Sequence, residues 1–182
     1  MPNGESLPDG VTRIAAAIEY DGSDYCGWQR QNHSPSVQAE AEKAFSVVGN
    51  EAIVVICAGR TDTGVHGTNQ IVHFDTRAKR SSRQWLLGVN ANLPRGIRIH
   101  WAEEIAAQFH ARFSATARTY RYVISNQFYR SALYHRLITW ERVHLNERLM
   151  EAAAQQLLGE HNFTSFRATG CQSLSPIRNV YS

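Results

Sequence analysis

The sequence is poor in the features that mark several common protein classes. Its 182 residues include three cysteines, an odd number at wide spacings that fits neither a disulfide framework nor a zinc site. The longest apolar run, Ala52 to Ala58, is far shorter than the ~20 residues that a membrane-spanning helix needs. No HExxH or HxxxH spacing occurs, and no Gly-Lys pair of a phosphate-binding loop. We therefore expect neither a membrane segment nor a metal site.

The few cysteines and the N-terminal residues indicate the cellular compartment. Cys26, Cys57 and Cys171 are expected to be reduced and to play no part in chemistry. The first ten residues are polar and turn-rich, without the basic and apolar parts of a signal peptide, so we expect residues 1–10 to be a disordered lead-in. A cytoplasmic location is the simplest expectation.

Charge is present but unevenly distributed. The formal net charge is +3, yet residues 1–76 hold 4 Lys and Arg against 10 Asp and Glu, whereas residues 77–121 hold 9 against 2. Eight of those nine cations are arginines, whose planar guanidinium suits phosphate oxygens. The segment 77–121 therefore predicts a polyanionic partner, most simply a nucleic acid, with a solvated basic face as the alternative.

Hydrophobic periodicity predicts an α+β fold. Apolar residues alternate with period two from Ile14 to Tyr20, and they recur at helical spacing after Ser34-Pro35 and again after Ser81-Ser82. The order is βαββαβ, which is ferredoxin-like, with an antiparallel sheet and helices on one face. The expected elements are a strand over 12–20, a helix from Ser34-Pro35 to Gly49, a central strand over 52–58, a loop over 59–67, a strand over 70–74, a helix over 81–93 and a strand over 97–101.

A second, incomplete α+β unit is expected to follow. It would begin with an aromatic strand from Tyr120 to Ile124, continue with a helix over about 146–158 closed by Gly159, and end within another strand. The predicted domains are accordingly an N-terminal α+β domain over 11–107 and a partial second domain over 108–182.

The loop over 59–67, GRTDTGVHG, is the best candidate for chemistry. It places Asp62 among small residues with Arg60 two positions earlier, and a nearby guanidinium would help keep an acidic nucleophile ionised. Its glycines allow the backbone to approach a ligand closely. Two other interpretations are an exposed Asp in an Asx-turn and a phosphoryl-transfer aspartate, the latter weakened because no lysine follows Asp62.

Five motifs in the same order resemble the bacterial tRNA pseudouridine synthase A family. They are EYDGSDYCGWQRQ over 19–31, SVQ over 36–38, GRTDTGVHG over 59–67, VNANLP over 89–94 and FHARFSATARTYRY over 109–122. The resemblance implies isomerisation of uridine to pseudouridine in the anticodon stem-loop of tRNA, without a cofactor, by a cytoplasmic homodimer. It also implies that the family continues beyond Ser182, so a truncated enzyme or a tRNA-binding fragment without turnover is expected.

Roles for individual residues follow from this resemblance. Asp62 would be the catalytic nucleophile, and Arg60 would displace the target base and pair with the aspartate. Tyr120 would stack on the flipped uracil and could move a proton, although Tyr122 has the same parity and a core position is the alternative. Thr63 stands where the family usually has alanine.

The resemblance also implies which residues bind RNA, because the motif that begins at Phe109 touches tRNA in the family. Cations and aromatics together suit backbone contact and stacking. For the two phenylalanines among them, simple packing is the alternative. The residues are Arg60, Arg80, Phe109, His110, Arg112 and Phe113.

Overall fold

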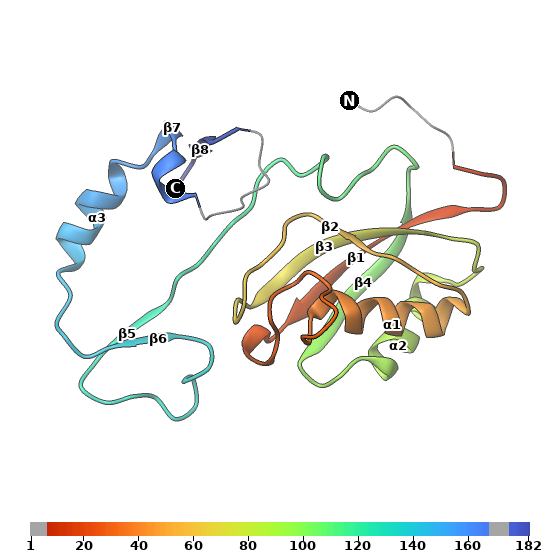
Figure 1. Cartoon of the computed structure of the whole chain (residues 1–182), viewed down its shortest axis with the longest axis horizontal. Coiled ribbons are helices and arrows are strands. Elements are labelled where there is room, and N and C mark those ends of the chain that lie inside the picture. The colour runs from red at the N-terminus through yellow and green to blue at the C-terminus, as the bar shows by residue number, and fades with distance from the viewer. Residues whose placement is uncertain (1–6, 168–174) are drawn as a thin grey trace. The chain divides into compact units, whose positions relative to one another are not determined.

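The computed structural model describes residues 7–167 and 175–182 and forms two compact units, Met1–Arg121 and Tyr122–Ser182 (Figure 1). This division falls later in the chain than the expected boundary after residue 107. Cys171 and residues 1–6 of the predicted lead-in lie outside the described residues. Residues 8–11 form a turn, in which the N–H of Val11 donates to the carbonyl of Pro8 at 3.0 Å.

The first unit contains a four-stranded antiparallel sheet in the order β2-β3-β1-β4. Both helices lie on the same face of the sheet (Figure 1), which confirms the ferredoxin-like βαββαβ prediction. The elements are β1 (Thr12–Tyr20), the short 3-10 helix η1 (Gly22–Asp24), α1 (Val37–Gly49), β2 (Ile56–Cys57), β3 (Gly67–Thr76), α2 (Ser82–Asn92) and β4 (Ile97–Ile105).

The core of this unit lies between the sheet and the helices. The apolar residues that alternate along β1 are fully buried there. Phe45 of α1 lies 4.7 Å from Phe74 of β3, measured between ring centroids, and 6.2 Å from Trp85 of α2. These three rings therefore join both helices to the middle of the sheet.

Both helices begin at serine caps. The Ser81 side chain and Gln84 form a capping box at the start of α2. Ser36, rather than the expected Ser34-Pro35, caps α1, because its hydroxyl accepts the amide proton of Ala39. The stop is also displaced by one residue: Gly49 is still helical, and Asn50 takes the left-handed conformation with φ 55°.

The prediction of a central strand over 52–58 is wrong. Only Ile56 and Cys57 pair with β3, and β2 is an edge strand of the sheet. Ile53 and Val55 are buried, whereas Val54 and Ile56 are exposed, so the apolar run buries one side only. The composition of the run suggested burial on both faces, which an edge position does not provide.

The second unit consists of small elements. None of its described residues is buried. The parallel pair of β5 (Ile124–Asn126) and β6 (Thr139–Glu141) precedes the helix α3 (Glu147–Gln155). The antiparallel pair of β7 (Gly159–Asn162) and β8 (Ile177–Val180) flanks the 3-10 helix η2 (Thr164–Phe166). Within the described part of the chain, no helix has the length and apolarity to cross a membrane.

Two predictions for this unit need correction. The strand expected from Tyr120 begins only at Ile124, because Tyr120 and Tyr122 are exposed and pair with no strand. The helix ends at Gln155, with Gln156 as its cap, and Gly159 at φ 90° opens β7 instead of closing the helix. The predicted strand near the chain's end is present as β8.

Candidate active site and RNA-contact segment

The loop between β2 and β3 is held at the end of the sheet where β1 finishes. Thr61 is its anchor, since the Tyr20 hydroxyl at the end of β1 lies 2.8 Å from Thr61 Oγ1. The N–H of Trp28 donates to the Thr61 carbonyl oxygen at 3.0 Å. Both partners are buried, so the residue next to Asp62 is fixed from two sides.

Glycine is required where other segments approach this loop. Gly27 has φ +88°, and a Cβ there would lie 2.6 Å from the Thr61 carbonyl oxygen. A Cβ on Gly22 would lie 2.0 Å from the carbonyl oxygen of Val65. The segment DGSDYCGWQ therefore packs on the loop backbone, which explains its glycines.

A buried polar pair on α1 binds both the segment that leads into the candidate loop and the segment that packs on it. Gln38 and Glu42 are buried one turn apart, and the Gln38 amide donates to Glu42 Oε1 at 2.9 Å. Glu42 Oε1 also accepts the N–H of Val55 at 3.1 Å, and its other oxygen pairs with Arg30. The backbone N–H of Gln38 donates to the Trp28 carbonyl at 3.0 Å. Sequence reasoning missed this pair, although two polar residues on the apolar side of a helix are its signal.

Asp62 itself projects from the loop and is exposed. Its carbonyl accepts the N–H of Val65 at 3.2 Å, closing a turn in which Gly64 has φ +77°. Among the hydrogen bonds between described residues, none uses the Asp62 carboxylate, so an Asx-turn does not account for this aspartate. The ion pairs between described residues do not include one from Arg60 to Asp62, although both side chains are exposed on the same loop.

The segment after β4 reaches this loop as well. The Arg118 guanidinium donates from Nε to the Ala58 carbonyl at 3.1 Å, and it occupies the space where a Cβ on Gly59 would lie. Tyr120 is 75% exposed, so the structure does not place it in a core. Burial chiefly raises the pKa of the Tyr20 phenol, and the nearby Tyr120 acts in the same direction. Tyr120 is thus an exposed residue of the segment after β4, near enough to Tyr20 to influence the pKa of its phenol.

The predicted RNA-binding residues 109–113 lie together in one turn. The ring of His110 stacks on Phe113 with centroids 4.3 Å apart, and the Arg112 guanidinium lies 5.8 Å from the centroid of the same ring. Phe109 is half-buried and meets the ring of His73 edge-on at 6.1 Å. Phe113 is 65% exposed, so packing in a core does not account for it.

Arg80 lies away from the Asp62 loop. It follows β3, whose Thr76 end pairs with Thr12, whereas the Gly67 end at the loop pairs with Tyr20. The ten residues of β3 separate the two ends by about 30 Å. The Arg80 Nε donates to the carbonyl of Val48 at 3.1 Å. Arg80 therefore lies toward the end of the sheet away from the Asp62 loop.

Comparison with known proteins supports these observations. A family model described as tRNA pseudouridine synthase matches residues 16–114. Proteins named tRNA pseudouridine synthase A are 59% identical over 169 residues in Shewanella denitrificans, 58% over 170 in Klebsiella pneumoniae and 56% over 180 in Escherichia coli strain SE11. This chain belongs to the tRNA pseudouridine synthase family.

The match covers the chain more fully than it covers the relatives. The three alignments include 93%, 93% and 99% of this chain, but only 65%, 63% and 66% of the relatives. This member of the tRNA pseudouridine synthase family thus spans about two thirds of the length of the curated relatives it matches. The family model includes the Asp62 loop and the 109–113 turn, and it ends before Tyr120.

Proposed function

We propose that the chain isomerises uridine to pseudouridine in the anticodon stem-loop of tRNA, with Asp62 as the nucleophile. The observation that supports this most is the loop itself, in which Thr61 is fixed by Tyr20 and Trp28 while the adjacent Asp62 carboxylate faces solvent. A rigid support with an exposed carboxylate is suited to attack on a substrate that enters from outside. Membership of the family supplies the class of reaction.

The reaction is an isomerisation, so it rearranges bonds within one nucleotide without adding or removing atoms. The bond between ribose C1′ and uracil N1 breaks, and a bond forms between C1′ and C5. The proton leaves C5, and N1 takes up a proton. Asp62 would act either by adding to the uracil ring or by acting at the sugar, and no cofactor is needed.

The neighbouring residues have roles that suit this chemistry. Tyr120 would stack on the extruded uracil and move a proton through its hydroxyl, and Arg60 would displace the base from its stem. The turn 109–113 would contact the tRNA backbone and bases, with Arg80 contacting a phosphate farther away. We further infer a cytoplasmic homodimer, on the family resemblance.

A second candidate is a tRNA-binding protein without turnover. The observation that favours it is the absence of any buried residue among the described part of the second unit, from Tyr122 to Ser182. Under this alternative the basic and aromatic turn would still bind tRNA, whereas the site around Asp62 would lack groups needed for the reaction.

Replacing the candidate nucleophile tests the proposal. In Asp62→Asn, pseudouridine formation on tRNA should be abolished while tRNA affinity stays within a few-fold, because one loop carboxylate contributes little to binding a polyanion. The matched control is Asp9→Asn, the same exchange in the turn before β1. Mapping of pseudouridine in the tRNA provides the measurement. Wild-type rates in Asp62→Asn would refute the assignment, and no product from the unmodified chain would favour the second candidate.

A further inference from the structure

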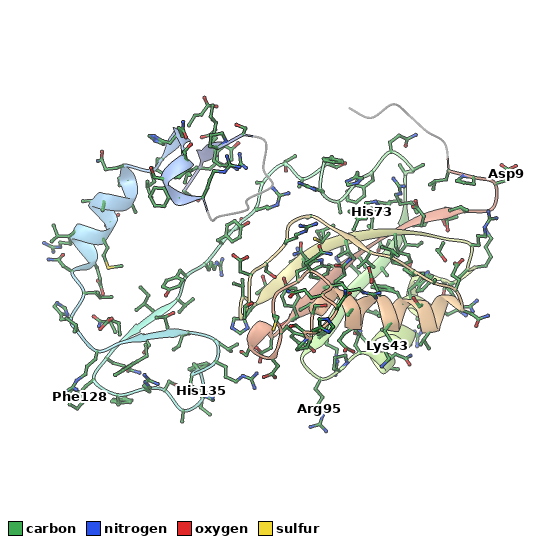
Figure 2. All side chains as sticks on the ribbon, in the orientation of Figure 1. Asp9, Lys43, His73, Arg95, Phe128 and His135 are labelled. Carbon is green, nitrogen blue, oxygen red and sulfur yellow. The ribbon has the colours of Figure 1, made fainter. Side chains whose placement is uncertain are left out.

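The face of the sheet away from the helices carries a small polar cluster. Along β1 and β3, Arg13 pairs with Asp75 and Ala15 pairs with His73. These four side chains alternate along the strands with the buried residues around Ile14, so they lie on the opposite face of the sheet. In Figure 2 the labelled His73 lies on the side of the sheet away from α1 and α2. Ala15 leaves room beside it for the His73 ring.

His73 is almost fully covered, at 2% exposure, by the turn 109–113. Its Nδ1 accepts the N–H of Ala111 at 3.1 Å, and Ala111 is itself 2% exposed. Because the backbone amide is the donor, His73 Nδ1 must be unprotonated, and the ring proton must lie on Nε2. The His73 ring also packs on His110, with centroids 4.7 Å apart.

His110, which packs on His73, accepts the next two backbone amides of the turn. Its Nδ1 accepts the N–H groups of Arg112 and Phe113 at 3.2 and 3.3 Å. Two imidazoles in contact, with their ring planes tilted by 59°, therefore accept three consecutive backbone amides, from 111 to 113. Of these three amides the Ala111 N–H is the buried one, so a change of conformation that removed its acceptor would leave a buried donor without a partner.

Arg13 holds the preceding residues. Its guanidinium pairs with Asp75 through two bonds of 2.7 Å, and its remaining nitrogen donates to the carbonyls of Ala107 at 2.6 Å and Phe109 at 2.8 Å. Arg13 thus fixes the carbonyl groups that enter the turn, while His73 fixes the amide at its centre.

We propose that His73 is a positioning residue for tRNA binding: by accepting the Ala111 amide from beneath, it fixes the conformation in which Arg112 and Phe113 are presented. The inference rests on the proposed function, because it assumes that the turn 109–113 contacts tRNA. An apolar residue of similar size would fill the space but would leave the Ala111 N–H without its acceptor.

The electrostatic surroundings keep this acceptor available. Burial chiefly, together with the positive Arg13 and the neighbouring His110, lowers the pKa of His73 to about 4, and Asp75 opposes this only in part. At neutral pH the ring is therefore uncharged and able to accept the amide proton.

The test compares two substitutions that differ in one atom's function. In His73→Asn the side-chain oxygen can replace Nδ1 as the acceptor, whereas His73→Leu keeps apolar volume and removes it. We expect His73→Leu to weaken tRNA affinity about tenfold and His73→Asn to stay within about threefold of wild type. Amide exchange at 111–113, followed by NMR on the full chain below its melting temperature, should be faster only in His73→Leu.

Two outcomes would overturn the proposal. One is faster exchange in His73→Leu with unchanged tRNA affinity, while Arg112→Ala does weaken binding. The other is an equal loss of affinity in both His73 variants, which would indicate packing instead of the hydrogen bond. If Arg112→Ala also binds tRNA like wild type, the contact assigned to this turn under the proposed function is wrong, and His73 no longer has a role in tRNA binding.

Discussion

The two units of this chain contain similar local signals but differ in burial. In the first unit, α1 has a serine cap and packs Phe45 against the sheet. In the second, α3 has an asparagine cap, and its amphipathic sequence leaves Leu149 68% exposed. A cap and a helical period specify a helix, but only a second apolar surface gives its stripe something to pack against.

The same contrast applies to the strands. The four strands of the first unit form one sheet covered by two helices, whereas the second unit has two separate two-stranded pairs. Isolated pairs of strands are marginal in water, because they bury little apolar area to offset the entropy of ordering the chain. We therefore place the stability of this chain in the first unit.

The largest difference between the units is expected for core truncation. Phe45→Ala removes a fully buried ring between Phe74 and Trp85 and should cost about 3–5 kcal/mol of unfolding free energy. Leu149→Ala, in the exposed stripe of α3, should change it by less than about 0.5 kcal/mol. Urea unfolding of both variants provides the measurement. Comparable losses would mean that α3 packs against a core after all.

Two glycines with nearly the same backbone conformation sharpen the contrast. Gly27 has φ +88° and would place a Cβ against Thr61, whereas Gly159 has φ +90° and nothing within 4 Å. Gly27→Ala should cost about 2–4 kcal/mol, from clash added to backbone strain. Gly159→Ala carries only the strain, about 1–2 kcal/mol, and within a unit without a core it should leave the main melting transition unchanged. Equal shifts in melting temperature would contradict this.

The smallest expected effect is a dependence on pH specific to the first unit. The pKa of His73 is lowered to about 4 in the folded chain, so the unfolded chain binds the proton more readily between that value and its ordinary 6.5. The stability contributed by the neutral ring is present above pH 6.5 and is lost as pH falls toward 4. Between pH 7 and 5, wild type should lose on the order of 1–2 kcal/mol more than His73→Asn. Identical losses in urea titrations would show that His73 does not titrate in this range.

Much of the first unit's fold was predictable because the residues that repeat at strand or helix spacing in its sequence are also the residues that are buried. The alternation from Ile14 to Tyr20 and the helical spacing around Trp85 both correspond to residues in the core. The apolar run over 52–58 was wrongly predicted to be a central strand. An edge strand and a central strand can have the same composition, and they differ in how many neighbouring strands they have. The aromatic run from Tyr120 to Ile124 misled for a related reason: a strand needs a partner, and within this run the partner strand β6 pairs with Ile124 at its end.

The candidate site was predictable in part. The loop and its exposed Asp62 follow from the sequence, and so does the turn 109–113 through its family resemblance. The supports of both could not be found, because Tyr20, Trp28 and His73 reach their partners through long-range contacts that no local pattern encodes. The place of Arg80 at the Thr76 end of β3 could not be found either, because nearness in sequence says little about position on an antiparallel sheet.

The central claim is that one unit carries both the packed core and the candidate site. Hydrogen exchange along the full chain at neutral pH tests it most directly, because opening free energies report local stability. Amides of β1, β3 and β4 should be strongly protected and exchange together, whereas amides of α3 and the strands after residue 122 should exchange with little protection. Protection of α3 equal to that of β1 would contradict the account.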